Sequence, residues 1–578
     1  MKYFLSFLSL CVLVSLFFCS GCTHLTHGPK KKAAPIITAD GQLSEESTSY
    51  YYFLEAEINK RKGNIDKALD NMVKAVEQDP ESIFLKKELA LMYLMANKTD
   101  SAMALLESIV AKDPKDIESL IMLGRVKQLL GHDINQIIGI YKKVIALDET
   151  QQNIYLLLGN LYLENNEPNN ALAIYRSLID HFPDAYAGYF YIGQIYAEQN
   201  QRKKAEQAFL KSIEIEPDLI ESRFEMVKLY PDNMEKTRAI YEEIIDIDPE
   251  NVEAKIELVI VCRKMKDQRC TGKLFHDLSE SQQKNNNTML KIVKVFVETE
   301  RFNDLLIVLD GMAHLLPNDP ETHYFMGMAN DKLKNYDQAI KHFQHIPQSS
   351  TYYVRSQVHT AFIYHERKDL PQAVRMLENA ISRDPKDVDL YIYMGSFHEE
   401  MEQFNDALAI FNKGLSISPD NPSLHFYIGV VYDKMGQSDL SLKQMKTVIR
   451  LDPDNPNALN YLGYTYADKG IKLDEAEAMI VKALSKKPND GYITDSLGWV
   501  YYQKGMFEKA LSYLQKAVVL VPDDPLILEH LGDTYIKLKH KQKALESYHR
   551  SLKNNHKDPK AIQLKIERLE LDASPDEN

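Results

Sequence analysis

The chain of 578 residues lacks most of the sequence features that identify an enzyme. A Gly-rich phosphate loop, a Gly-x-Ser-x-Gly elbow, a His-Glu-x-x-His motif and paired Cys-x-x-Cys motifs are all missing. No stretch alternates apolar and polar residues as a strand does, and apolar residues recur at helical spacing almost throughout. These absences predict an elongated, all-helical protein that is not an enzyme and needs no cofactor.

Excess positive charge is also missing. Lys and Arg number 69 against 83 Asp and Glu, which gives a formal net charge of −14. Binding to nucleic acid depends on neutralising phosphates with a basic stripe, and no such stripe is present. We therefore expect no nucleic-acid partner.

Cysteine is scarce. Beyond the first 22 residues the only thiols are Cys262 and Cys270, and five cysteines occur in all. Export from the cell would place the two in an oxidising compartment, where a disulfide between neighbouring helices is one hypothesis. Two buried free thiols are the alternative.

The first residues differ from the rest of the chain. Lys2 precedes an apolar run over residues 3–18, short for a spanning helix, which ends in a Cys-Ser-Gly-Cys sequence at Cys22. This layout is typical of a secretory signal. The ending resembles the bacterial lipobox, which implies that residues 1–21 are removed and Cys22 is acylated. Thr23 then implies an outer-membrane anchor in the cell envelope, on the periplasmic face. An uncleaved membrane anchor and an ordinary signal peptide are the alternatives.

A thirty-four-residue period runs through most of the chain and is best seen between Asp389 and Pro419. Gly395 lies in a first helix and Ala407 in a second, and both are expected to be small because two antiparallel helices approach closely where these residues face each other. Phe411 is expected to cover the other side of the pair. A closing Pro ends the second helix.

The same small residues recur at the same repeat positions along the chain, and this arrangement resembles the tetratricopeptide repeat family. The small position of the first helix is held by Gly124, Gly159, Gly193, Gly327, Gly395, Gly429, Gly463, Gly498 and Gly532. The small position of the second helix is held by Ala68, Ala102, Ala171, Ala205, Ala339, Ala373, Ala407, Ala510 and Ala544.

The resemblance implies an α-solenoid, a right-handed superhelix of about fifteen helix-turn-helix units whose first helices line an inner groove. We predict the following order: a signal peptide (1–21), a lipid-anchored flexible tether (22–48), an N-terminal array (49–249), a degenerate junction (250–318), a C-terminal array (319–554), a capping helix (555–572) and a disordered tail (573–578). The junction lacks the recurring Gly and Ala residues. It is therefore either a hinge or a set of repeats that have diverged in sequence and pack like the others.

His342 and His345 stand three apart on a predicted helix. They are close enough to share a metal ion, but the sequence offers no further ligands at the same place. Surface or seam positions are therefore preferred, and no metal is predicted.

The strongest candidate site is aromatic. At ~100° per residue, Trp499 projects away from the seam that Leu497 and Tyr501 form with the second helix. A row of rings edged by carboxylates is expected on that groove-lining face, although the alternative is that these rings pack between neighbouring first helices. The predicted row consists of Phe426, Asn460, Tyr464, Tyr492, Asp495, Trp499, Tyr502, Gln503 and Asp533.

These observations favour a lipid-anchored, non-enzymatic scaffold. Its groove would bind a basic or aliphatic-aromatic peptide segment and support an envelope machine for secretion, pilus assembly, polysaccharide export or cell-wall synthesis. A structural spacer or oligomer component is the alternative. A peptidoglycan- or glycan-acting enzyme subunit, with Asp495 and Asp533 as acid and base, is a weaker one because an open groove does not desolvate a carboxylate.

Overall fold

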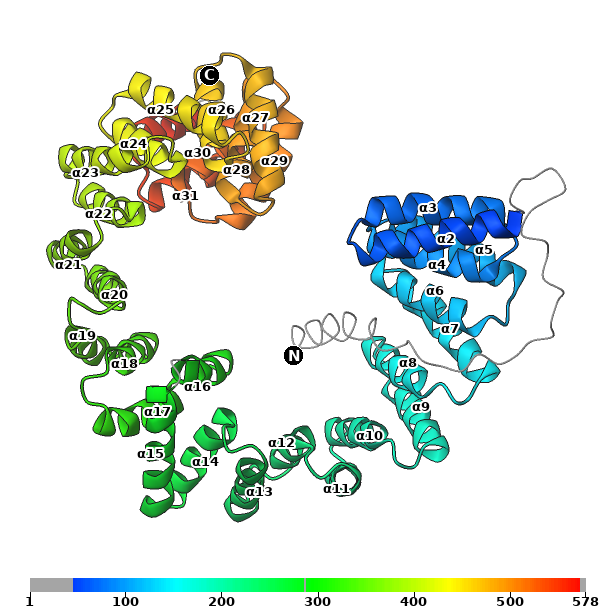
Figure 1. Ribbon diagram of the computed structural model, residues 1–578. Helices are drawn as coiled ribbons and strands as arrows, with labels where there is room; N and C mark the ends of the chain where they lie inside the picture. Colours follow the sequence, from blue (N-terminus) through cyan, green and yellow to red (C-terminus); the bar gives the residue numbers. More distant parts are fainter. Residues whose placement is uncertain (1–44, 285–286, 572–578) are drawn as a thin grey trace. The chain divides into compact units, whose positions relative to one another are not determined.

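The structure is a computed structural model that describes residues 45–284 and 287–571 (Figure 1). These residues form 31 helices and no strand. The predicted all-α solenoid is therefore confirmed. None of the described helices is both long and apolar enough to span a bilayer.

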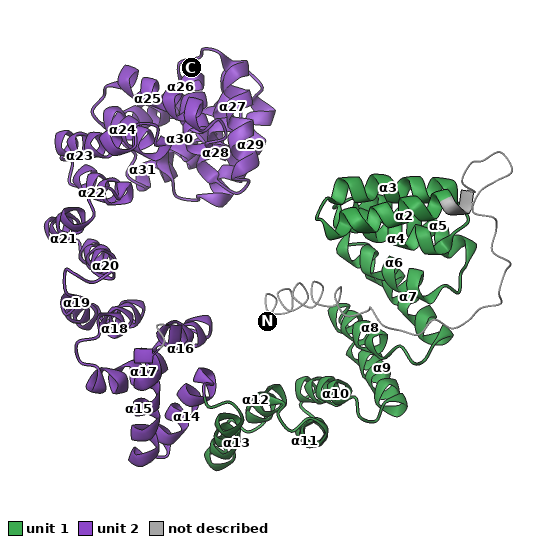
Figure 2. Ribbon diagram, viewed as in Figure 1, with its two compact units in different colours: residues 1–249 green, residues 250–578 purple. Residues whose placement is uncertain are grey.

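The chain divides into two compact units, residues 1–249 and 250–578 (Figure 2). The boundary falls at the start of the predicted junction. The first unit contains α2 (Glu45–Arg61), α3 (Ile65–Gln78), α4 (Ile83–Met95), α5 (Thr99–Lys112), α6 (Ile117–Leu129), α7 (Ile134–Leu147), α8 (Gln152–Glu164), α9 (Pro168–His181), α10 (Tyr186–Glu198), α11 (Arg202–Ile215), α12 (Ile220–Lys228) and α13 (Met234–Ile247).

The second unit contains the remaining described helices. They are α14 (Val252–Lys264), α15 (Gln268–Lys284), α16 (Asn287–Glu298), α17 (Phe302–Leu315), α18 (Pro320–Lys332), α19 (Tyr336–Gln344), α20 (Tyr353–Glu366), α21 (Leu370–Arg383), α22 (Val388–Glu400), α23 (Phe404–Ile417), α24 (Pro422–Lys434), α25 (Ser438–Leu451), α26 (Pro456–Asp468), α27 (Leu473–Lys486), α28 (Gly491–Gln503), α29 (Phe507–Leu520), α30 (Pro525–Lys537), α31 (Lys541–Lys553) and α32 (Pro559–Leu571).

Within each unit, consecutive helices form antiparallel hairpins. Each even-numbered helix from α2 to α30 is the first helix of a hairpin, and the odd-numbered helix after it is the second. Fifteen such pairs are described, which agrees with the predicted number of repeats. The single helix α32 packs on α31, so it covers the last hairpin.

Short polar signals start and stop these helices. Asp387 and Asn421 each follow a closing proline by two residues and cap the next helix, where their side chains accept a hydrogen bond from a backbone N–H of the first turn. Glu402, with φ of 59°, makes the left-handed turn inside one hairpin. Pro419 lies directly after the C-cap of α23, where it prevents the helix from continuing.

The small residue of the first helix has a different role from the one predicted. Gly395 does not simply face Ala407: a Cβ at Gly395 would overlap the ring of Phe411 from the second helix. In another hairpin, a Cβ at Gly327 would lie 2.5 Å from Cε1 of Phe343. The glycine is therefore a slot for a large apolar side chain, and the helices mesh ring into slot rather than backbone against backbone.

The degenerate junction folds into two hairpins, α14–α15 and α16–α17. Cys262 at the end of α14 and Cys270 in α15 form a disulfide, with their Cα atoms 6.1 Å apart. Packing here departs from the regular pattern, because the second helices α15 and α17 contact each other, whereas other successive hairpins meet through their first helices or through a second helix and the first helix after it. The aromatic ring of Phe275 fills the space over Gly311, so a ring-and-slot contact also joins two second helices.

The predicted tether overlaps the first helix. Since α2 begins at Glu45, residues 45–48 belong to a helix and not to a flexible segment. Acylation of Cys22, the rest of the tether, the signal peptide and the C-terminal tail lie outside the described residues and stay predictions.

Candidate protein-binding surface

The predicted aromatic row lies on the first helices α24, α26, α28 and α30, but its centre is not open. Trp499 is only 9 % exposed. Its indole stacks on Tyr502, with ring centroids 4.6 Å apart, and on His530 of α30, at 4.0 Å. The expectation that Trp499 lines an open groove was therefore wrong, because neighbouring first helices pack directly on each other and enclose its ring.

Asp495 is also enclosed. Both of its carboxylate oxygens lie 3.0 Å from Nδ1 of His530, and the two side chains are almost fully buried. Burial of the imidazole by itself lowers its pKa, but the adjacent Asp495 carboxylate outweighs this, so the pKa of His530 is raised above its usual value. Asp495 therefore joins α28 to α30 as half of an ion pair, and it does not edge a groove.

Two polar atoms of the row have no hydrogen-bond partner among the described residues. They are Nε1 of Trp499 and Oδ1 of Asn460, and both atoms are buried. A buried donor and a buried acceptor without partners cost free energy. Tyr464, half-buried nearby, has its pKa raised by burial and by the surrounding carboxylates.

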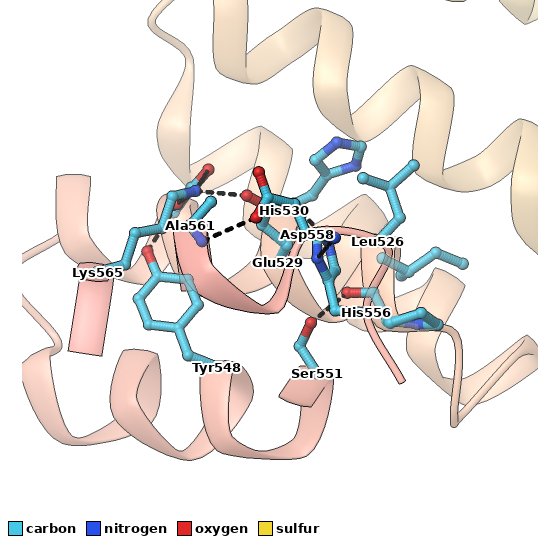
Figure 3. Close-up of polar contacts among 12 residues, drawn as sticks. Leu526, Glu529, His530, Tyr548, Ser551, His556, Asp558, Ala561 and Lys565 are labelled. Carbon is cyan, nitrogen blue, oxygen red and sulfur yellow. Dashed lines mark hydrogen bonds and ion pairs between the residues drawn. The ribbon is translucent and has the colours of Figure 1, made fainter. Parts of the chain in front are cut away.

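Asp533 is held in a polar network at the C-terminal cap. Tyr548 donates a hydrogen bond to it at 2.6 Å, and Nζ of Lys565 from α32 lies 2.6 Å from its Oδ1. Lys565 also pairs with Glu529 at 2.7 Å, and His556 lies 2.9 Å from the same carboxylate (Figure 3). Asp533 was predicted to edge the groove, but the structure shows it fastening α32 to α30.

The other members of the row are only partly covered. Tyr492 is exposed, with 57 % of its surface accessible, and Tyr502, Gln503 and Phe426 are half-buried. The row is thus a packed layer with accessible edges, which is the alternative that the sequence left open.

A cavity of about 680 Å³ opens elsewhere in the second unit. It lies beside α20, α22 and α24, three successive first helices. Its lining also includes one residue of the α22–α23 turn, the first residue of α23 and one residue of the α31–α32 connection. The lining residues are Phe362, His365, Ser396, Phe397, Glu399, Glu400, Glu402, Phe404, Lys434 and Lys557.

Three rings in contact, Phe362, Phe397 and His365, form the least polar part of this cavity. Phe362 contacts Phe397 edge to face at 5.8 Å between centroids, and His365 stacks on Phe397 at 4.9 Å. Phe397 is buried, whereas Phe362 is 39 % exposed. The sequence carried a signal for Phe362 that we did not use: it follows the small residue Ala361 just as Trp499 follows Gly498.

Charged side chains surround these rings. Glu400 lies 2.7 Å from Nε2 of His365, and Glu399 pairs with Lys434. Glu402 and Lys557 are both exposed, and no ion pair of theirs is found among the described residues. The cavity therefore offers an apolar wall, one unpaired carboxylate and one unpaired ammonium group.

His342 and His345 lie in a separate cluster with His323 of α18. The ring centroid of His323 is 5.6 Å from that of His342 and 4.9 Å from that of His345. Burial and the neighbouring imidazoles lower the pKa of His342 to about 4. No group of three or more His, Cys, Asp or Glu side chains suited to a metal ion occurs in the part of the chain that the structure describes.

Stacked helical hairpins with an enclosed seam and an accessible first-helix face define a repeat scaffold of the α-solenoid class. Family models described as tetratricopeptide repeat or TPR repeat match residues 61–124, 156–219, 320–346, 364–427, 428–491 and 498–539, which together make up more than half of the chain. The chain belongs to the tetratricopeptide repeat family, a scaffold suited to protein–protein interaction.

Individual relatives match only short segments. A TPR repeat-containing protein of Pseudomonas aeruginosa is 37 % identical over 67 residues, which is 12 % of this chain and 11 % of that protein. The anaphase-promoting complex subunit CDC16 of Saccharomyces cerevisiae is 36 % identical over 93 residues, 15 % of this chain and 11 % of the other. The chain thus spans about a tenth of the length of these curated relatives.

Among solved structures, that of Naa15/Naa10 bound to HypK-THB is similar over 90 % of this chain and 89 % of the other, with 15 % identity and a TM-score of 0.42. We draw no argument from that similarity.

Proposed function

We propose that the chain is a non-catalytic scaffold, anchored to lipid through Cys22, that binds segments of partner proteins in the bacterial envelope. The partners would belong to a machine for secretion, pilus assembly, polysaccharide export or cell-wall synthesis. The observation that carries this proposal is the cavity beside α20, α22 and α24, where the ring of Phe362 stays accessible next to a preformed aromatic wall.

Phe362 has the properties of a binding hot spot. Its ring is held in place by edge-to-face contacts with Phe397 and with Tyr393, at 5.2 Å, so little side-chain entropy is lost when a partner covers it. The unpaired Glu402 and Lys557 flank the wall. An apolar partner side chain next to residues of opposite charge fits this arrangement.

The test is capture of partners from native membranes with wild-type protein, a Phe362→Ala variant and a Tyr186→Ala control. Tyr186 is 40 % exposed on α10, which matches the exposure of Phe362. If Phe362 is a hot spot, its loss should cost about 2 kcal/mol or more, which is about thirtyfold in Kd. Tyr186→Ala should capture the same partners as wild type. Equal capture by all three proteins would contradict the proposal.

A spacer or oligomer role is the second candidate. It predicts that neither substitution changes the set of captured proteins and that light scattering of the purified chain shows a defined oligomer. The geometry does not favour the enzyme hypothesis, because both carboxylates of its acid–base pair are engaged: Asp495 pairs with His530 and Asp533 with Lys565.

A further inference from the structure

The first described helix has a second apolar face. Tyr50, Tyr51, Leu54 and Ile58 of α2 are each between 41 and 63 % exposed, and we call them the α2 ridge. At ~100° per residue they lie within about 100° of each other around the helix. Four large apolar side chains on one exposed face form a patch, and such patches mark interaction sites.

The opposite side of α2 is where this helix packs into the fold. Ala56 is fully buried, and the hydroxyl of Ser49 donates a hydrogen bond to the carbonyl of Ala75 in α3. Phe53 packs edge to face on Phe84 of α4, at 5.5 Å between centroids. The ridge is therefore not needed to hold α2 on its neighbours.

The two ends of the described solenoid differ in degree. At the other end, α32 covers α31 and turns Ile562 and Ile566 inward, although Leu564 and Leu571 stay exposed. Terminal repeats need a polar outer surface to stay soluble, and the α2 ridge does not provide one. No described part of the chain covers the ridge.

Charge on the ridge favours an anionic occupant. Arg61, in the last turn of α2, lies on the same side as the ridge, and Lys62 follows directly after the helix; both are exposed, and no ion pair of theirs is found among the described residues. Of the two carboxylates on the flanks of the ridge, that of Glu57 is held by Lys60 at 3.0 Å and that of Glu55 has no ion pair among the described residues, so the unpaired charges sum to one positive charge. Aromatic and aliphatic side chains beside unpaired cations are the composition of helices that lie in a lipid interface.

The place of α2 in the chain points the same way. Cys22 precedes Glu45 by 23 residues. A chain of that length spans at most about 80 Å, so an acyl group at Cys22 would keep the start of α2 within that distance of the bilayer.

We infer that the α2 ridge docks on an anionic lipid surface, with Tyr50, Tyr51, Leu54 and Ile58 in the headgroup region and Arg61 and Lys62 against phosphates. The inference rests on the lipid anchoring in the proposed function, because two weak membrane contacts together hold a protein far better than one.

The experiment separates the ridge from the acyl group. The chain from residue 22 onward with Cys22→Ser keeps every described residue and cannot be acylated. Its sedimentation is measured with vesicles of phosphatidylethanolamine and phosphatidylglycerol, and with neutral phosphatidylcholine vesicles. We expect binding to the anionic vesicles to be stronger by about tenfold or more, because each basic residue at such a surface contributes about fivefold.

Two variants and a control locate the binding. Tyr51→Ser/Leu54→Ser/Ile58→Ser should lower vesicle binding about tenfold or more, and Arg61→Gln/Lys62→Gln should remove the preference for anionic vesicles. The control Leu129→Ser/Leu210→Ser/Val519→Ser removes three exposed apolar side chains elsewhere and should bind as the parent does. Circular dichroism checks that all proteins stay helical.

Other results would overturn the inference. One such result is equal vesicle binding by the ridge variant and the control. Another is a parent protein that does not bind vesicles and forms a dimer in light scattering, when the ridge variant stays monomeric. Partner capture through Phe362 and the mass of the native N-terminal peptide test the proposed function separately, so the two can fail independently.

Discussion

Trp499 and Phe362 show how one position in the repeat leads to two outcomes. Each follows the small residue of its first helix, so each points to the same side of its hairpin. His530 and Tyr502 enclose Trp499, whereas the ring of Phe362 stays partly exposed. The chemical role of such a residue depends on the side chains that the next hairpin brings to it.

Replacing Trp499 with Ala should therefore destabilise the C-terminal hairpins. The change removes the ring that separates Tyr502 from the Asp495–His530 pair and leaves a cavity, so we expect a loss of about 3–5 kcal/mol. Hydrogen exchange of α28 and α30 measures the effect. The control Tyr492→Ala, on the exposed side of the same helix, should change stability by less than about 0.5 kcal/mol. Unchanged protection in the Trp499 variant would contradict the packing described here.

His342 makes the α18–α19 hairpin sensitive to acid. Burial and the imidazoles of His323 and His345 lower its pKa to about 4, so the unfolded chain takes up a proton more readily than the folded one. The contribution of neutral His342 to the stability of the hairpin is therefore fully present above the ordinary histidine pKa of ~6.5, and it is lost as the pH falls toward 4. Because the ring is partly exposed, we expect a loss of about 1–2 kcal/mol.

Hydrogen exchange of α18 and α19 at pH 7 and pH 5 tests this expectation. His342→Gln should reduce the difference between the two pH values, and His132→Gln, at an exposed position of the first unit, should leave it unchanged. An equal pH dependence in all three proteins would show that His342 is not the group responsible.

At the scale of the elements, the degenerate hairpins are the informative ones. The α14–α15 hairpin lacks the small Gly and Ala residues that recur in the other repeats, but a disulfide between Cys262 and Cys270 joins its helices across the turn. A covalent link restricts the unfolded hairpin and so compensates for a less regular seam.

Removing this disulfide should loosen the hairpin. For a loop with a sequence separation of 8, the chain-entropy estimate is about 2.5 kcal/mol. Cys262→Ser/Cys270→Ser should lower hydrogen-exchange protection of α14 and α15 accordingly, and a reducing agent should have the same effect on the wild type and none on the variant. A wild type that does not respond to reduction would contradict the prediction, and non-reducing mass spectrometry would then show whether both thiols are free.

At the scale of the whole molecule, the solenoid has no shared core. Each described hairpin buries its apolar faces against its neighbours in sequence, and the buried residues fall into several separate clusters. Stability in such a chain is a sum of local contributions, so distant repeats need not unfold together.

The single tryptophan makes this testable. Trp499 is the only one in the chain and lies in the C-terminal hairpins, so its fluorescence reports on those hairpins alone, while circular dichroism reports on all helices. We expect the two signals to give different denaturant midpoints in the same titration. Coincident curves would mean that the chain unfolds as one cooperative body.

By itself, the sequence determined the repeat. The period, the recurring Gly and Ala positions and the closing prolines act over a few residues, so the number of hairpins followed from the pattern alone, but the packing of a ring over each Gly did not. The same register showed which residues, Trp499 and Tyr464 among them, leave the seam of their own hairpin.

Only the tertiary structure decided which of those residues stay accessible. His530 is 31 residues away from Trp499 in sequence, yet it encloses the Trp499 ring. Lys557 is far from Phe362 in sequence, yet both side chains line the same cavity. These contacts depend on how successive hairpins stack, and stacking is set by many small packing choices that no single-hairpin pattern contains. For that physical reason the aromatic row was found in the sequence but its burial was not.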